Sequence, residues 1–251
     1  MIERVPYGSD PLQFGEICCP SGSGPYPVVI VIHGGFWRAK YDLSYIRPVC
    51  DSLAEAGIAT WNLEYRRIGN PGGGWPGTLD DVAGGAKFLR SIASEFNLDL
   101  SRMIAMGHSA GGHLALWLGA RQEIFRAVIS LAGVADLRRA WDLKLSNTVV
   151  ADFLAGSPDE VSERYDYASP IELLPFGIPL RVFHGTDDDS VPLELSDRFV
   201  RVARLRGDDA ELITLPGAGH FELVDPRKRE FALVRETAVN LCRGGHRPSL
   251  Q

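Results

Sequence analysis

The sequence is poor in cysteine and has no surplus of positive charge. Its 251 residues include four cysteines, and two of them, Cys18 and Cys19, are adjacent, which is a poor arrangement for a disulfide. The cysteines show neither zinc-ligand spacing nor a disulfide framework, so we expect reduced thiols in a reducing compartment. The formal net charge of −6 argues against nucleic acid and anionic membranes as partners, because no basic surplus can neutralise phosphates.

Long apolar runs are also missing. Residues 1–6 contain no positively charged leader followed by an apolar core, and no later run approaches the length of a membrane span. We therefore expect a cytoplasmic protein with no membrane partner. There is no internal repeat and no linker. Because 45% hydrophobic and 23% charged residues is ordinary globular usage, this length predicts one domain over residues 1–251.

Buried strands alternate with amphipathic helices along most of the chain. Residues 27–32 form a continuous β-branched run, typical of a strand buried on both faces of a parallel sheet. Residues 133–170 break the rhythm and could fold over the carboxyl edge of the sheet as a small cap insertion. The pattern predicts an α/β fold with a mostly parallel central sheet and helices on both faces. Further strands are expected at 58–63, 101–107, 127–131, 178–184 and 211–215, and helices at 43–56, 79–96, 193–206 and up to about 242.

One short motif stands between a strand and a helix. The residues Gly107-His-Ser-Ala-Gly111 fit the pattern G-x-S-x-G, which in this context predicts a nucleophile elbow. A sharp strand-to-helix turn crowds the backbone around its central residue, so glycine is needed on either side. Ser109 would then stand at a helix N-terminus, where free N–H groups favour a developing negative charge. An ordinary tight turn is the alternative interpretation.

A serine hydroxyl is a weak nucleophile and needs a base, an orienting acid and oxyanion donors. His220 is the candidate base, because it follows the last core strand and gives the chain order Ser, Asp, His. The acid is expected among three adjacent aspartates that follow another strand; alternate residues point to opposite sides, so only one can face His220. These aspartates are Asp187, Asp188 and Asp189. The other histidines are interpreted as organising the glycine loop (His33), as packed or capping residues (His108, pointing away from the serine, His113 and His184), or as solvated in the tail (His246).

The glycine turn after residues 27–32 contributes candidates for the oxyanion hole and for the substrate pocket. We predict an oxyanion hole from the N–H of Ala110 and those of Gly35 and Phe36. Phe36, Trp37 and Trp75 are candidates for lining a substrate pocket, with a place in the core as their alternative.

Taken together, the motifs resemble the α/β-hydrolase superfamily over nearly the whole chain. Within it, the chain is similar to esterases related to hormone-sensitive lipase, to arylformamidases and to the catalytic domain of prolyl-oligopeptidase-like hydrolases. Phe36 stands where the lipase pattern usually has a third glycine, which favours the arylformamidase-like version. The spacing His-Gly-x-x-Asp-x-x-Val-Pro resembles the acid loop of related hydrolases and assigns the acid to Asp188, with Asp187 as the alternative. The motifs are His33-Gly-Gly-Phe-Trp37, Tyr65-Arg66, Gly107-His-Ser-Ala-Gly-Gly112, Ser169-Pro170, His184-Gly-Thr-Asp-Asp-Asp-Ser-Val-Pro192 and Gly217-Ala-Gly-His220.

These parts and the resemblance predict a serine hydrolase with the triad Ser109, Asp188 and His220. The expected substrate is a small acyl ester, which makes the protein a carboxylesterase, and an arylformamidase acting on N-formylkynurenine-type amides is the close alternative. Neither reaction implies a metal or an organic cofactor. A non-catalytic ligand-binding protein is the alternative from another class, because a fold alone does not imply activity.

Overall fold

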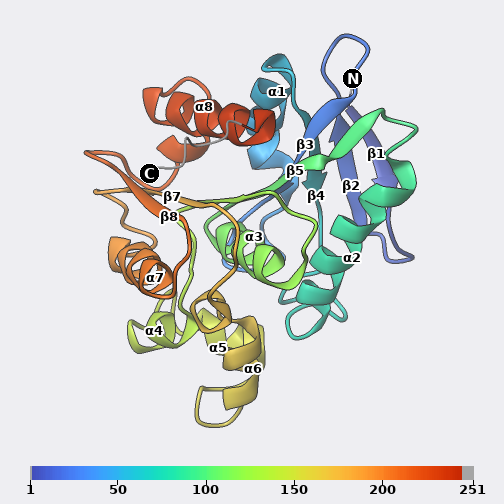
Figure 1. Ribbon diagram of the computed structural model, residues 1–251. Helices are drawn as coiled ribbons and strands as arrows, with labels where there is room; N and C mark the ends of the chain where they lie inside the picture. The colour runs from blue at the N-terminus through green and yellow to red at the C-terminus, as the bar shows by residue number, and fades with distance from the viewer. Residues whose placement is uncertain (1, 245–251) are drawn as a thin grey trace.

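The computed structural model describes residues 2–244, which are built around one eight-stranded sheet (Figure 1). The strand order is β1-β2-β4-β3-β5-β6-β7-β8. β1 and β2 run antiparallel to their neighbours, and every pair from β4 to β8 is parallel. The sheet is therefore mostly parallel, as the sequence predicted. Its strands are β1 (Ile2–Pro6), β2 (Phe14–Cys18), β3 (Tyr26–Ile32), β4 (Ala59–Leu63), β5 (Leu98–His108), β6 (Val128–Leu131), β7 (Leu180–Gly185) and β8 (Ala210–Leu215).

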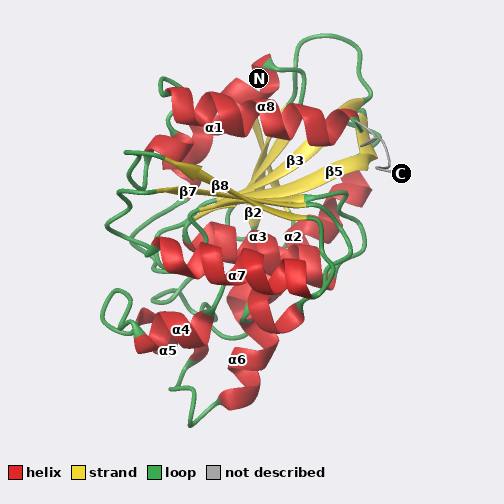
Figure 2. Ribbon diagram, turned by 60° about the vertical axis from the view of Figure 1, so that its left-hand side comes forward, coloured by secondary structure: helices red, strands yellow, loops and turns green. Residues whose placement is uncertain are grey.

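Helices cover both faces of the sheet. Figure 2 shows α1 and α8 on one side and α2, α3 and α7 on the other, with α4, α5 and α6 farther out on that second side. The α-helices are α1 (Arg47–Glu55), α2 (Gly77–Ile92), α3 (Ala110–Arg121), α4 (Leu137–Asp142), α5 (Val149–Leu154), α6 (Ser162–Ala168), α7 (Leu193–Leu205) and α8 (Arg229–Arg243). Three short 3₁₀ turns, η1 (Leu43–Ile46), η2 (Pro170–Leu173) and η3 (Glu222–Val224), complete the described elements.

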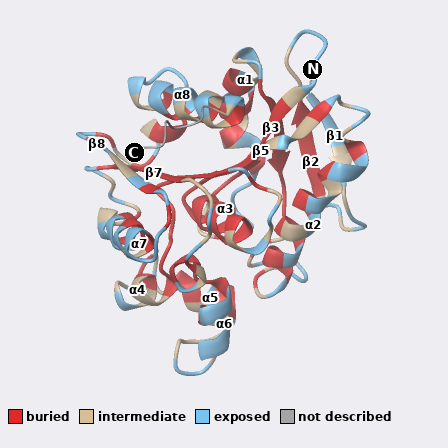
Figure 3. Ribbon diagram, viewed as in Figure 1, coloured by how far each residue is buried: buried red, intermediate tan, exposed pale blue. Residues whose placement is uncertain are grey.

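The central strands are buried on both faces (Figure 3). Successive side chains of a strand point to opposite faces, and β3 shows the consequence. Val28 and Ile30 pack into the core under α2, α3 and α7, whereas Val29 and Val31 pack into the core under α1 and α8. A strand that must be apolar on both faces produces the continuous β-branched run seen in the sequence.

Two helices differ from their predicted bounds. The helix expected at residues 79–96 spans Gly77–Ile92; the turn that follows it contains Asn97 in a left-handed conformation with φ of 50°, directly before β5. The helix expected at 43–56 begins with the 3₁₀ turn η1, where the Asp42 carboxylate accepts the N–H of Ser44. This first turn carries Tyr45, which is important for the site.

The inserted segment 133–170 contains three of the short helices and packs against α3. The backbone carbonyl of Tyr167 accepts a hydrogen bond from Trp117 Nε1 at 3.1 Å. On the other side, the carbonyl of Phe153 accepts the N–H of Trp75, which belongs to the loop after β4. The segment thus connects the helix that follows Ser109 to a loop at the carboxyl edge of the sheet.

Candidate active site

Ser109 stands at a strained turn between β5 and α3. Its backbone has φ of 58° and ψ of −123°, a conformation that non-glycine residues rarely adopt and that clusters at functional sites. A Cβ on Gly107 would lie 2.0 Å from the Gly111 carbonyl oxygen, and a Cβ on Gly111 would lie 2.1 Å from that of Ile32. No larger residue fits at either position without moving the backbone. The sequence analysis predicted glycine at these positions for this steric reason.

The acid loop after β7 selects one of the three adjacent aspartates. Asp188 Oδ2 lies 2.7 Å from His220 Nδ1, and the Asp188 side chain is fully buried. Its other oxygen accepts the N–H groups of Ser190 and Val191, both at 2.9 Å. Asp187 and Asp189 are exposed. Of the three aspartates, only Asp188 is therefore hydrogen-bonded to His220, and its role as the acid stays a prediction.

His184 is a partner of Asp188 that the sequence reasoning treated only as a packed residue. Its Nε2 lies 2.9 Å from the Val191 carbonyl oxygen and 3.3 Å from Asp188 Oδ2, and its Nδ1 lies 2.7 Å from Ser196 Oγ. A carbonyl only accepts, so Nε2 carries the proton. Burial alone would raise the pKa of the Asp188 carboxyl, but hydrogen bonds from His184 and His220 hold that pKa well below its ordinary value. Asp188 is thus a carboxylate held between two imidazoles.

The loop after β3 lies directly against Ser109, the candidate nucleophile. A Cβ on Gly34 would lie 2.8 Å from Ser109 Cβ and 2.6 Å from the His108 carbonyl oxygen. Gly35 and Phe36 follow with positive φ values of 105° and 51°. Ala110 is the first residue of α3, so its N–H has no acceptor within the helix. The predicted oxyanion donors therefore come from two segments that meet at Ser109.

A network of buried polar side chains holds the loop after β3 in place. His33 Nε2 lies 3.0 Å from Glu64 Oε1, the same carboxylate bonds Arg67, and the Tyr65 hydroxyl donates to the His33 carbonyl at 2.7 Å. All four side chains are essentially inaccessible to solvent. His33 therefore organises the glycine loop, as the sequence indicated. Glu64 and Arg67 were not identified from the sequence, although charged residues directly after a buried strand were the available signal.

His108 is packed, as the sequence predicted. Its ring lies against His220, with ring centroids 4.5 Å apart, a contact that the sequence did not predict. His108 Nε2 lies 2.9 Å from the His220 carbonyl oxygen. The residue before the serine thus contacts the residue proposed as its base. His246 lies outside the described residues.

The three candidate pocket aromatics have different places. Trp37 is completely buried, stacks on Phe153 at 4.7 Å and donates its Nε1 hydrogen to His113 Nδ1. The prediction that Trp37 lines a pocket is therefore wrong, because the left-handed turn at Trp37 directs its ring into the core. Phe36 and Trp75 are partly exposed, and Trp75 packs edge-on against Tyr167 of the inserted segment. They remain pocket candidates.

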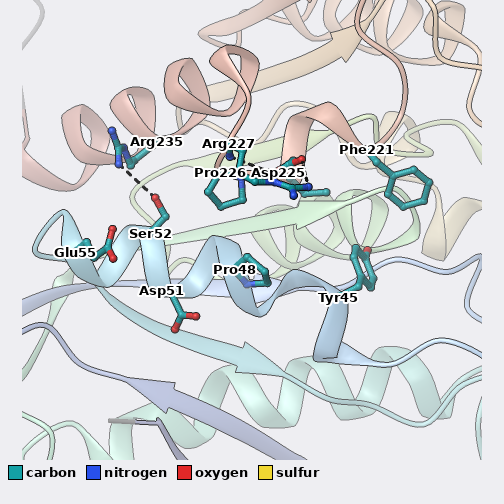
Figure 4. A pocket seen from close by; sticks show the side chains of 11 residues that line it. Tyr45, Pro48, Asp51, Ser52, Glu55, Phe221, Asp225, Pro226, Arg227 and Arg235 are labelled. Carbon is teal, nitrogen blue, oxygen red and sulfur yellow. Dashed lines mark hydrogen bonds and ion pairs between the residues drawn. The ribbon is translucent and has the colours of Figure 1, made fainter.

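A groove of about 700 Å³ starts next to the candidate site and runs between α1 and α8 (Figure 4). Tyr45 and Phe221 stand at one end of it, and Phe221 packs edge-on against His220 with ring centroids 5.2 Å apart. The rest of the groove is lined by Pro48, Asp51, Ser52, Glu55, Val224, Asp225, Pro226, Arg227 and Arg235.

Within residues 2–244, no group of three or more His, Cys, Asp or Glu side chains could hold a metal ion. The four cysteines are free thiols. In that same part of the chain, no helix is long and apolar enough to cross a membrane.

Comparison with known proteins identifies a family and several similar proteins. The family model described as BD-FAE matches residues 16–202. A probable isoprenylcysteine alpha-carbonyl methylesterase of Arabidopsis thaliana is 26% identical over 96% of this chain and 55% of its own length. A kynurenine formamidase of Aspergillus versicolor is 30% identical over 69% of this chain and 74% of its own. The chain spans about half the length of the plant methylesterases that it matches.

Solved structures share the fold. A truncated carbohydrate esterase from gut microbiota has a TM-score of 0.81 and 23% identity, covering 96% of this chain and 95% of that one. A butyrate-bound esterase of Thermogutta terrifontis has a TM-score of 0.75 and 22% identity, covering 94% and 91%. The predicted α/β-hydrolase fold is therefore confirmed.

Proposed function

Because the chain belongs to the BD-FAE family, which is of the α/β-hydrolase type, we propose that it is a serine hydrolase acting on small carboxylic esters. The observation that carries the proposal is the buried pair of Asp188 and His220, joined at 2.7 Å and packed against the elbow of Ser109. The similarity to a plant methylesterase and to a probable carboxylic ester hydrolase of Mycobacterium tuberculosis supports the choice of an ester.

The first half of the proposed reaction forms an acyl-enzyme. Ser109 Oγ attacks the ester carbonyl carbon while His220 takes the serine proton at Nε2, because Nδ1 already donates to Asp188. The Asp188 carboxylate stabilises the imidazolium that forms. The C–O bond of the ester then breaks, and the imidazolium gives its proton to the departing alcohol.

The developing negative charge on the carbonyl oxygen needs donors that are already in place. The N–H of Ala110 and the N–H groups of Gly35 and Phe36 are the proposed donors, and the His33 and Glu64 network holds their loop against the elbow. In the second half, His220 activates a water molecule that attacks the acyl-enzyme and releases the acid. The proposed chemistry requires no metal or organic cofactor. A cytoplasmic location remains a prediction from the sequence.

A formamidase is the second candidate, and the 30% identity to a kynurenine formamidase favours it. The same groups would cleave a formamide, because a formyl group also passes through a tetrahedral intermediate on the serine. We also expect a preference for short acyl chains, since residues 133–170 form only the short helices α4, α5 and α6 and supply no large apolar lid.

The test compares the wild type with Ser109→Ala on aryl esters of increasing acyl length and on N-formylkynurenine. We expect acetyl or butyryl esters to be the best substrates, and Ser109→Ala to lose about 10⁵-fold or more in kcat while keeping its melting temperature. Faster turnover of N-formylkynurenine would select the formamidase. A folded Ser109→Ala variant that keeps most of its turnover would eliminate the serine mechanism, and binding without turnover by the wild type would favour a non-catalytic binding protein.

A further inference from the structure

A continuous chain of hydrogen bonds joins three loops of the candidate site through Tyr45 and His108. The N–H of Gly34 donates to the Tyr45 hydroxyl oxygen at 2.6 Å. That oxygen lies 3.0 Å from His108 Nδ1, and His108 Nε2 lies 2.9 Å from the His220 carbonyl oxygen. The chain thus runs from the oxyanion loop, through the residue before Ser109, to the loop that carries the proposed base.

The protons in this chain have only one possible arrangement. The His220 carbonyl can only accept, so His108 Nε2 must carry a proton. Burial, reinforced by the nearby His220, lowers the pKa of His108 to about 3, so the ring is neutral and Nδ1 must accept. The Tyr45 hydroxyl therefore donates to Nδ1 and accepts from Gly34. Every hydrogen-bonding group in the chain has a compatible partner.

Tyr45 reaches the site from an unrelated part of the fold. It belongs to η1, which precedes α1, and its hydroxyl is the group that contacts both the oxyanion loop and His108. The ring itself packs edge-on against His108 and Phe221, with centroids 5.9 Å and 6.4 Å away. Removing the hydroxyl alone would leave this packing in place and would break the chain in the middle.

We propose that Tyr45 and His108 are positioning residues, which hold the oxyanion loop and the backbone of His220 in register with Ser109. This inference rests on the proposed hydrolase function, because it states how the same site keeps its geometry. Neither residue is assigned contact with the substrate. Their loss should therefore reduce the rate of the chemical step and leave substrate binding largely unchanged.

Tyr45→Phe tests the hydroxyl, and Tyr165→Phe is the matched control. Tyr165 is fully buried, whereas Tyr45 is partly exposed, and the Tyr165 hydroxyl also makes a hydrogen bond, to the Gly156 carbonyl oxygen at 3.2 Å, but it lies in the inserted segment. We expect kcat of Tyr45→Phe to fall about 10-fold or more, which is less than the 10²–10³-fold loss of an oxyanion donor, with KM within about 2-fold. Tyr165→Phe should keep both constants. Equal kcat values for the two variants, at comparable melting temperatures, would overturn the proposal.

A double-variant cycle adds a test of connection. If Tyr45 and His108 act through one chain, Tyr45→Phe should have little further effect on kcat in a His108→Gln background. If the two substitutions reduce kcat independently, so that their effects multiply in the double variant, the proposed series of hydrogen bonds would be contradicted. A His108→Gln variant that does not fold leaves the comparison of Tyr45→Phe with its control decisive.

The tautomer of His108 can be measured without any activity. In ¹⁵N spectra of the wild type near neutral pH, we expect His108 to be neutral with its proton on Nε2, and Tyr45→Phe to shift the Nδ1 resonance. A proton on His108 Nδ1, or a positively charged His108 ring, would exclude the proposed series of hydrogen bonds. If the wild type hydrolyses no substrate but shows this tautomer, the proposed function fails while the hydrogen-bond chain stands.

Discussion

The candidate active site and the groove between α1 and α8 lie side by side and differ in how their polar groups are held. In the site, the Asp188 side chain is fully buried and has partners on both carboxylate oxygens. In the groove, Arg227 is 88% exposed and bonds Asp225, two residues away. The open volume therefore lies beside the site, while the buried polar groups with fixed partners lie within it. Buried polar groups are costly to desolvate, so their concentration identifies the site better than the size of a cavity does.

The largest effect that separates these regions is expected at the acid. Asp188→Asn should lower kcat by about 10⁴-fold, because an amide cannot hold His220 in the required tautomer or stabilise its cation. Asp187→Asn and Asp189→Asn serve as controls, since both side chains are exposed and should cost little. Steady-state kinetics of the three variants decide the assignment, and a large loss at Asp187 with activity kept at Asp188→Asn would reassign the triad.

A smaller effect should appear in stability against pH, through a buried polar group outside the triad. Burial lowers the pKa of His113 to about 4, below its usual value near 6.5. As the pH falls from 6.5 towards 4, His113 binds a proton in the unfolded chain but stays neutral in the folded chain, so the free energy of unfolding decreases. Between pH 7 and pH 5 this amounts to about 2 kcal/mol for His113.

Urea denaturation of the wild type and of His113→Gln at pH 7 and pH 5 measures the contribution of His113 to the loss of stability. His113 Nε2 donates to the Ala168 carbonyl, and glutamine offers an uncharged donor instead. We expect a smaller loss of stability on acidification in His113→Gln than in the wild type. The same loss in both proteins would show that His113 does not titrate as its burial predicts.

The smallest effect is expected in the groove itself. Arg227→Ala and Arg235→Ala should leave kcat/KM for a small aryl ester within about 2-fold, because both residues are exposed and the surface contacts of Arg227 with Asp225 and of Arg235 with Ser52 contribute little. A loss of 10-fold or more in either variant would mean that the groove takes part in catalysis on small substrates, and the contrast drawn between the two regions would fail.

The sequence predicted those parts of the site that depend on local structure. The elbow could be predicted because its glycines, its serine and the following helix are contiguous. Asp188 could be proposed as the acid because the spacing His-Gly-x-x-Asp-x-x-Val-Pro resembles the acid loop of related hydrolases. His184, four residues before Asp188, carried a usable signal in that same spacing. The fold was predictable for a similar reason, since strands buried on both faces have a distinct composition.

The missed features depend on contacts between distant segments. Tyr45 and His108 are 63 residues apart, and no local pattern distinguishes the hydroxyl of Tyr45 from that of a surface tyrosine. Trp37 was misplaced because the direction of its ring depends on a left-handed backbone turn. Sequence spacing indicates which residues share a strand end, whereas tertiary packing decides which side chains face each other.

The most direct test of the account is covalent labelling by an organophosphonate, followed by mass spectrometry of the intact protein and of its peptides. An activated serine should react once per chain, at Ser109, and neither Ser109→Ala nor His220→Ala should be labelled under the same conditions. Asp188→Asn should react far more slowly than the wild type. A wild-type protein that remains unlabelled, or that carries the label on another residue, would contradict the proposed triad.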